Sequence, residues 1–325
     1  MKFEPGIRCA LVIAVACTLA APAAAQTWPA RPVRIIVPFA PGGGVDTVTR
    51  FLAQKLGEQT GGSFVVDNRP GGAGILGAEL VARAAPDGYT LLTSAPEFSI
   101  NPSVRPKLPY DPFKDFAYIS QLTAGQFMLA SHPSVPVTTV RQLIALAKAR
   151  PDQLNYGSSG TGGINHLAGE LFQSMTGIRW VHVPFKGAGP STIGLIGGHI
   201  DFVFASTTGL VGPARAGKVR AIAVTGPERF TELPEVPTIA ESGVPGYYVT
   251  GWYGFYAPAG TLAEIVRRLH AEARRALNSP DMTEKLAKTG NVPVASSPEE
   301  FVAFMRAEIG KWAQVIKDSG LKKID

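Results

Sequence analysis

The sequence has almost no cysteine, and the little it has lies at one end. Its two cysteines, Cys9 and Cys17, fall within the first 25 of 325 residues. Without that segment the chain has no thiol, which excludes disulfides, zinc–thiolate sites and cysteine nucleophiles. We therefore expect a fold that is stabilised by its hydrophobic core.

Long apolar runs are also scarce. The run at Cys9–Ala21 follows a basic segment and is too short to span a bilayer. It is followed by the small-residue pattern Ala23-x-Ala25, which is typical of a secretory signal peptide. We expect residues 1–25 to be removed near Ala25-Gln26 and the mature protein to be exported. A retained anchor and a lipidated Cys17 are the alternatives.

Charge is not concentrated anywhere in the chain. Lys and Arg number 31 against 25 Asp and Glu, a formal net charge of +6, and basic residues are scattered. This distribution argues against a nucleic-acid partner and is compatible with a small anionic ligand. With 36 Gly and 27 Pro, the chain is rich in turns but remains below the level of low-complexity sequence.

Short apolar runs alternate with amphipathic stretches, which predicts an α/β fold with mostly parallel sheets. The first unit is expected to have strands at 33–39, 64–66 and 89–93 and helices at 45–59 and 75–84. A second unit is expected to have strands at 127–130, 154–156, 180–183, 201–205 and 219–224 and helices at 140–149, 166–175 and 191–196. An aromatic strand at 247–256 precedes helices at 262–277, 282–286 and 299–317, which are expected to pack back on the first unit. The pattern predicts two lobes, residues 26–124 with 249–325 and residues 125–248.

Two glycine-rich loops follow predicted strands. The first, Pro38 to Asp46, lets backbone approach a ligand closely, and the helix that follows it offers unpaired N–H groups to an anion. It lacks the Lys-Ser/Thr of a phosphate-binding loop, so a nucleoside triphosphate is not expected. Asp46 either caps the helix or faces the ligand.

The second loop, Tyr156 to Gly163, is rich in hydroxyl groups. Ser158, Ser159 and Thr161 can donate hydrogen bonds to a carboxylate, although Ser159 can instead cap the next helix. Both loops lie at the carboxyl ends of strands, where ligands bind in open α/β sheets. We therefore expect the two loops to hold one anion between two helix N-termini.

Other motifs carry weaker signals. The G-x-G-x-x-G pattern at Gly72–Gly77 is separated from its strand by Asp67–Pro70 and follows an earlier βα unit, so a nucleotide cofactor is not expected. None of the five histidines, all beyond the leader, has a metal-binding spacing, so no metal is expected. No other cofactor is indicated.

A secreted serine hydrolase is the alternative function. Ser158 or Ser159 would be the nucleophile and His166 its base, with Asp201 as the third member. No G-x-S-x-G motif is present, and His166 can equally pack its helix. Asp201 either braces a neighbouring loop or reaches the ligand through water.

The motifs, taken in order, resemble the periplasmic Bug receptors, the substrate-binding proteins of tripartite tricarboxylate transporters. The resemblance covers nearly all of the mature chain. Its motifs are Trp28-Pro29-x-Arg31-Pro32 with the strand and loop through Asp46, Val66–Gly74, Pro86–Leu91, Tyr110-Asp111-Pro112, Tyr156–Gly160, His166-Leu167-Ala168, Val183–Gly187 and Pro237-Thr238.

The resemblance implies a two-lobed, type II-like periplasmic binding fold that closes on its ligand, without catalysis. It implies a small carboxylate ligand, such as an amino acid, a dicarboxylate or an aromatic acid, held by main-chain donors and water. It also implies a monomer that engages membrane transporter subunits or a sensor, and no nucleic acid. The residues expected to bind the ligand are Phe39, Ala40, Gly43, Gly44, Asp46, Ser94, Ser158, Ser159, Thr161, Phe185, Lys186 and Asp201.

The segment Ser94–Pro102 is expected to help select the ligand. It has Glu97 and Phe98 where many members of the family have small residues. If Glu97 enters the cleft, it disfavours a second carboxylate on the ligand and favours an amine or a neutral tail. If Glu97 faces solvent, it indicates nothing about the ligand.

Overall fold

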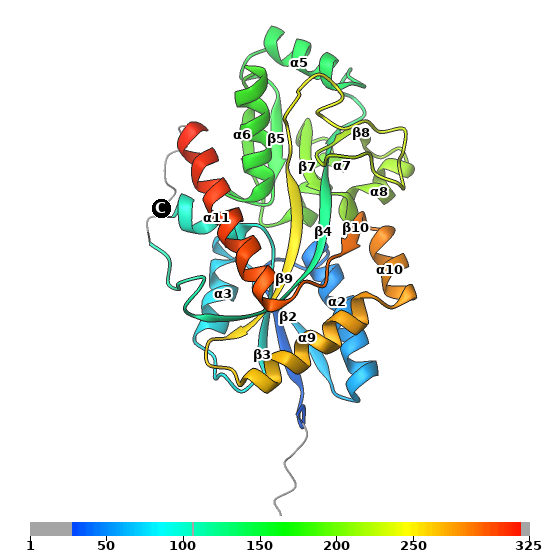
Figure 1. The fold of residues 1–325 in the computed structure, drawn as a ribbon. Coiled ribbons are helices and arrows are strands. Elements are labelled where there is room, and N and C mark those ends of the chain that lie inside the picture. The colour runs from blue at the N-terminus through cyan, green and yellow to red at the C-terminus, as the bar shows by residue number, and fades with distance from the viewer. Residues whose placement is uncertain (1–27, 106, 320–325) are drawn as a thin grey trace, which may run out of the picture.

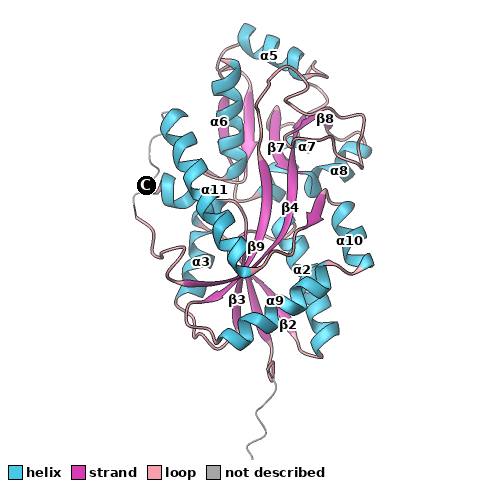
Figure 2. Cartoon of the chain, viewed as in Figure 1, coloured by secondary structure: helices cyan, strands magenta, loops and turns pink. Residues whose placement is uncertain are grey.

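The structure is a computed structural model that describes residues 28–105 and 107–319 (Figure 1). The predicted signal peptide, residues 1–25, lies outside the described residues. The strands form one continuous curled sheet with the order β2-β1-β3-β9-β4-β7-β5-β6, and β8 and β10 also pair with β4. Helices cover both faces of each half of this sheet, and the halves form two lobes (Figure 2).

The first lobe begins with parallel strands. The central strand β1 pairs with β2 and β3, and its four apolar residues are buried while its one charged residue, Arg34, is exposed. Its elements are β1 (Val33–Val37), α2 (Gly44–Thr60), β2 (Phe64–Asn68), the 3-10 helix η1 (Gly72–Gly74), α3 (Ile75–Ala82), β3 (Thr90–Ser94) and α4 (Glu97–Val104).

The second lobe repeats this arrangement. Strand β5 pairs in parallel with β6 and β7, and the helices that connect the strands pack against them. Its elements are α5 (Val140–Ala149), β5 (Asn155–Ser158), α6 (Ile164–Thr176), β6 (Val181–Pro184), α7 (Ala188–Ile196), β7 (Phe202–Ser206), α8 (Thr207–Arg215) and β8 (Arg220–Val224).

One long strand, β4 (Phe116–Ser131), belongs to both lobes. Its first part, from Phe116 to Gln126, pairs antiparallel with β9 (Thr250–Pro258), and its last part, from Phe127 to Ser131, pairs with β7 and β8. The expectation of a strand at 127–130 was too short, because polar residues and register shifts interrupt the alternating pattern of the first part. Strand β4 therefore runs through the middle of the molecule (Figure 1).

The C-terminal elements connect the lobes further. Helix α9 (Ala263–Leu277) packs on α2 and β4, and α10 (Pro280–Ala287) leads to β10 (Asn291–Pro293). Helix α11 (Pro298–Ser319) contacts α4 and β4 and also α6 of the second lobe. Its Phe301 belongs to a core cluster of the first lobe, whereas Trp312 belongs to that of the second. The helix was expected to pack on the first unit alone, but it packs on both lobes.

Two helices that the sequence pattern did not predict lie near the junction of the lobes. Helix α4 contains Pro102, and α8 contains Pro213, and a proline inside a helix hides the helical signal. Within residues 28–105 and 107–319, none of the helices is both long and apolar enough to span a membrane.

Candidate functional site

A cleft of about 470 Å³, solvent-filled space included, opens between the lobes. Its walls come from the carboxyl ends of strands on both sides and from the helices that follow them, as expected for an α/β fold. It is lined by Phe39, Ala40, Gly43, Gly44, Val45, Ala95, Pro96, Glu97, Phe127, Ser159, Ile164, Asn165, Ala188, Ser206 and Tyr253.

The start of α2 forms one wall. Gly43 is its N-cap residue and has an extended backbone, and no side chain caps the helix. Gly44 approaches β9 so closely that a Cβ atom there would lie 2.0 Å from the hydroxyl oxygen of Tyr253. The first-turn N–H groups of α2 therefore lie at the wall of the cleft, where they favour an anion.

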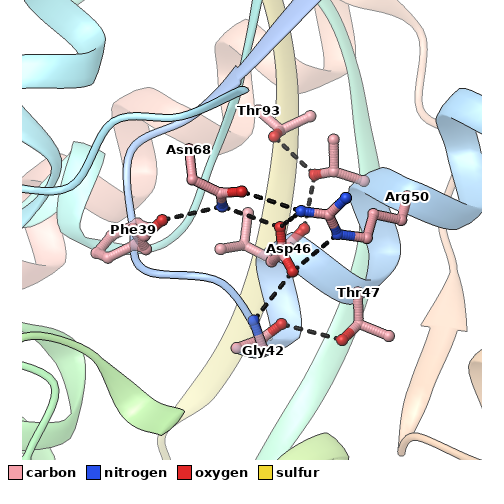
Figure 3. Close-up of polar contacts among 10 residues, drawn as sticks. Phe39, Gly42, Asp46, Thr47, Arg50, Asn68 and Thr93 are labelled. Atoms are coloured by element: carbon pink, nitrogen blue, oxygen red, sulfur yellow. Dashed lines mark hydrogen bonds and ion pairs between the residues drawn. The ribbon is translucent and has the colours of Figure 1, made fainter. Parts of the chain in front are cut away.

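Asp46 holds this loop in shape from behind the cleft (Figure 3). Its Oδ2 accepts hydrogen bonds from the Gly42 N–H and from Arg50, and its Oδ1 accepts from Arg50 and Asn68. Burial alone would raise the pKa of the Asp46 carboxyl, but the hydrogen bonds from Arg50, Gly42 and Asn68 lower it overall. Asp46 does not line the cleft.

The serine loop, Tyr156 to Gly163, is braced by two stacked histidines, of which His166 is buried and His182 is half-buried. The Ser158 Oγ lies 2.6 Å from the Nε2 of His182 and also accepts the Gly160 N–H. The His182 ring stacks on His166 with the centroids 3.9 Å apart, and the His166 Nδ1 accepts the Gly162 N–H. Burial lowers the pKa of His166 to about 4, and burial together with His166 lowers that of His182 to about 3. Both rings are therefore neutral near pH 7.

This arrangement differs from the expected hydrolase triad. Ser158 is fully buried and contacts His182 in place of His166. Asp201 accepts the Asn155 N–H at the far end of the sheet and contacts neither histidine. A strongly lowered histidine pKa also makes a poor general base at neutral pH. The structure therefore does not bring Ser158, His166 and Asp201 together as a catalytic unit.

Ser159 and Glu97 meet across the cleft. The Ser159 hydroxyl lies 3.3 Å from the Glu97 Oε1 and 3.0 Å from the Asn165 Oδ1, and can donate to one of them at a time. The Ile164 N–H, in the first turn of α6, also donates to the Glu97 Oε1 at 3.3 Å. Burial raises the pKa of the Glu97 carboxyl, although its own N–H, Ile164 and Ser159 counteract the effect.

The structure brings only some of the predicted residues to this cleft. Phe39, Ala40, Gly43, Gly44 and Ser159 line it. Seven predicted residues do not line it: Asp46, Ser94, Ser158, Thr161, Phe185, Lys186 and Asp201. Of these, Ser94 lines an adjoining cavity of about 190 Å³, Phe185 packs against Gly157 and Gly194, and Lys186 is exposed.

Sequence reasoning missed several lining residues. Ser206 directly follows the apolar run of β7, so the rule that ligands bind at strand ends would have found it. Tyr253 lies within the buried strand β9, where nothing in the pattern distinguishes it from a core residue. Among the described residues, no group of three or more His, Cys, Asp or Glu side chains is arranged to hold a metal ion.

Comparison with known proteins identifies the family. Residues 48–321 match the tripartite tricarboxylate transporter family receptor. Protein BugT of Bordetella pertussis is 36% identical over 306 residues, which cover 94% of each chain.

Two solved structures are similar along nearly their whole length. The structure of R. palustris Rpa4515 with adipate is 38% identical with a TM-score of 0.88, covering 90% of this chain and 98% of that one. The structure of MatC from Rhodopseudomonas palustris with bound malate is 32% identical with a TM-score of 0.84, covering 89% of this chain and all of that one. The chain therefore belongs to the tripartite tricarboxylate transporter receptor family, the solute-binding proteins that include the Bug receptors, and has their two-lobed periplasmic binding protein fold.

Proposed function

We propose that this protein binds a small carboxylate in the cleft between its lobes and delivers it, in the periplasm, to a tripartite tricarboxylate-type transporter in the membrane. The carrying observation is that the N-termini of α2 and α6 both reach one cleft, from opposite lobes. Each directs the positive end of a helix dipole at the cleft; the start of α2 has no side-chain cap, whereas on α6 the Ile164 N–H is already bonded to the Glu97 Oε1.

The composition of the cleft supports a carboxylate over a phosphate ester or a metal complex. Among the described residues, no Lys or Arg lines its wall, and most of the lining side chains are apolar. A small organic acid can fill such a cavity with its carbon chain and place one carboxylate on main-chain donors. The adipate and malate in the two related structures are ligands of this chemical class.

Binding is expected to draw the lobes together. A ligand that contacts both α2 and α6 binds the closed form better than the open form, and so shifts the population toward it. The closed form presents a surface to the membrane subunits, or to a sensor, that the open form lacks. The protein acts as a monomer, because one chain contains both walls of the cleft.

A screen of carboxylates by thermal shift tests the proposal. Purified protein is first unfolded and refolded to remove any bound acid, and native mass spectrometry checks that it is empty. We expect some small organic acids to raise the melting temperature in a concentration-dependent manner. If no member of a broad set of mono-, di- and tricarboxylates, amino acids and aromatic acids stabilises the empty protein, the proposal is wrong.

A further inference from the structure

Glu97 lies in the cleft, and none of the described residues forms an ion pair with it. It is the first residue of α4, separated from the end of β3 by Ala95 and Pro96, and only 4% of it is exposed. It lines both the main cleft and the adjoining cavity of about 190 Å³. Together with Phe39 and Ala95, it therefore lies where the two cavities adjoin.

The carboxylate of Glu97 occupies an anion position that belongs to the other lobe. Its Oε1 accepts the Ile164 N–H at the start of α6, and the Ser159 hydroxyl lies at the same distance, 3.3 Å. These are the donors that a ligand carboxylate would use on that lobe. The start of α2, on the opposite wall, has no such internal acceptor in the cleft.

When the Glu97 carboxyl is ionised, the cleft carries a net negative charge. No Lys, Arg or His lines either cavity, and Glu97 forms no ion pair among the described residues. Arg50, close to the first loop, already binds Asp46 with two nitrogens. A buried carboxylate without a cation is costly, and a ligand that supplies the cation removes that cost.

The adjoining cavity supplies polar groups but no cation. The Nδ2 of Asn101 donates to the Ala73 carbonyl, and the Asn101 side chain also interacts with the hydroxyl of Tyr110, which lines the same cavity. Neither side chain is positively charged, so among the described residues this cavity also leaves the Glu97 carboxylate without a cation. A ligand group that reaches Glu97 from this side can donate hydrogen bonds to it.

From this geometry we infer that the ligand carries one carboxylate, bound at the start of α2, and one ammonium-type group, bound by Glu97. The inference rests on the proposed function and narrows it to amino acids in the broad sense. A dicarboxylate would place a second negative charge beside Glu97 with no cation near, and would bind weakly. In this respect the chain differs from its relatives that hold adipate or malate.

Calorimetric titration of the empty protein with matched acids tests the inference. One set has six carbons: adipate, hexanoate, 6-aminohexanoate and 2-aminohexanoate. The other has four: succinate, butanoate, 4-aminobutanoate and 2-aminobutanoate. We expect an amino acid to bind at least about tenfold more tightly than both the diacid and the unsubstituted acid of its set. If another carboxylate binds best in the broad screen, its diacid, amino and unsubstituted forms make up a third set with the same criterion.

Two variants separate the role of Glu97 from a general effect on folding. Glu97→Gln keeps an acceptor oxygen for Ile164 and Ser159 but removes the charge, and should weaken amino-acid binding about tenfold or more while improving binding of the diacid. Glu308→Gln is the control, because Glu308 is also buried but binds Trp252 and Trp312 away from the cleft. It should leave the ranking of ligands unchanged.

The outcomes distinguish this inference from the function on which it rests. If a diacid or an unsubstituted acid binds as tightly as the amino acids, or if Glu97→Gln leaves the ranking unchanged, the inference is overturned and the carboxylate receptor stands. If no carboxylate binds at all, the proposed function itself fails.

Discussion

The hydroxyl of Ser158 and the imidazole of His182 lie 2.6 Å apart, Oγ to Nε2, behind the serine loop. A serine beside a histidine suggests a nucleophile, but both groups here are turned away from the cleft. Ser158 is fully buried, and its oxygen also receives the Gly160 N–H. The pair therefore shapes the loop that presents Ser159 to the cleft.

The first prediction concerns reactivity. The native protein should not be labelled by a fluorophosphonate probe, because Ser158 is inaccessible and the lowered pKa of His182 makes it a weak base. Ser158→Ala should instead lower the free energy of unfolding by about 1–2 kcal/mol, because it removes a buried hydrogen-bonded hydroxyl. Mass spectrometry of the labelled protein and urea denaturation are the measurements. Labelling at Ser158 or Ser159 would contradict this prediction and support the serine hydrolase alternative.

The second prediction concerns pH. Burial lowers the pKa of His166 to about 4 and, with His166, that of His182 to about 3, whereas both are near 6.5 in an unfolded chain. Between these values the unfolded chain binds more protons, so this contribution to stability is complete above about pH 6.5 and is lost as the pH falls toward 4. The melting temperature should fall over this range.

A matched pair of variants isolates that contribution. In His182→Gln one of the two stacked rings no longer titrates, so the melting temperature of this variant should depend less on pH between 6.5 and 4. His199 is exposed, and His199→Gln should follow the pH dependence of the parent protein. If the melting temperature depends on pH in the same way in the parent protein and both variants, the two histidines do not cause the loss of stability.

The third prediction concerns Asp46, which acts on the site without lining it. Asp46→Asn weakens the bonds to the Gly42 N–H and Arg50 that hold the first loop. It should reduce the affinity for the carboxylate several-fold and cost about 1–3 kcal/mol of stability. Titration calorimetry and thermal melting measure the two effects. Asp67→Asn, which removes a more exposed carboxylate from Arg34 and Arg69, is the control and should leave affinity unchanged.

The fourth prediction concerns space at the start of α2. Gly44→Ala puts a methyl group where the Tyr253 hydroxyl already lies, and overpacking of this kind costs about 1–3 kcal/mol. The helix must move, and its N–H groups with it, so ligand binding should weaken by about tenfold or more. Gly310→Ala, in α11, meets nothing within 4 Å and should bind ligand normally. Normal binding by Gly44→Ala would show that α2 does not contact the ligand.

Much of the fold could be predicted, because strands such as β1 and helices such as α5 show their periodicity within one short segment. The predicted helix at 140–149 coincides with α5. The first part of β4 could not be predicted, because it contains the polar residues Ser120, Gln121 and Thr123. They are buried because β9 and the segment around Ser296 cover them. Burial of this kind comes from distant segments and leaves no local pattern.

The site was predictable to the level of loops and not of side chains. Gly43 and Gly44 were expected at the site because a glycine-rich loop after a strand lets the backbone approach a ligand, and both line the cleft. Ser158 and Ser159 are adjacent and chemically identical, yet one faces His182 and the other faces Glu97. Which of them reaches the cleft is decided by β6 and α4, elements that lie far away in the sequence.

The passage of β4 through both lobes has a consequence for the thermodynamics of capture. The proposed opening and closing of the lobes would bend a strand that is hydrogen-bonded to β9 on one side of Gln126 and to β7 and β8 on the other. The bent strand stays ordered in both the open and the closed state. Few backbone torsions therefore become fixed when the lobes close, and the loss of conformational entropy is small. Most of the contact energy with the solute is then available to hold it, and a small molecule with few atoms can keep the two halves together.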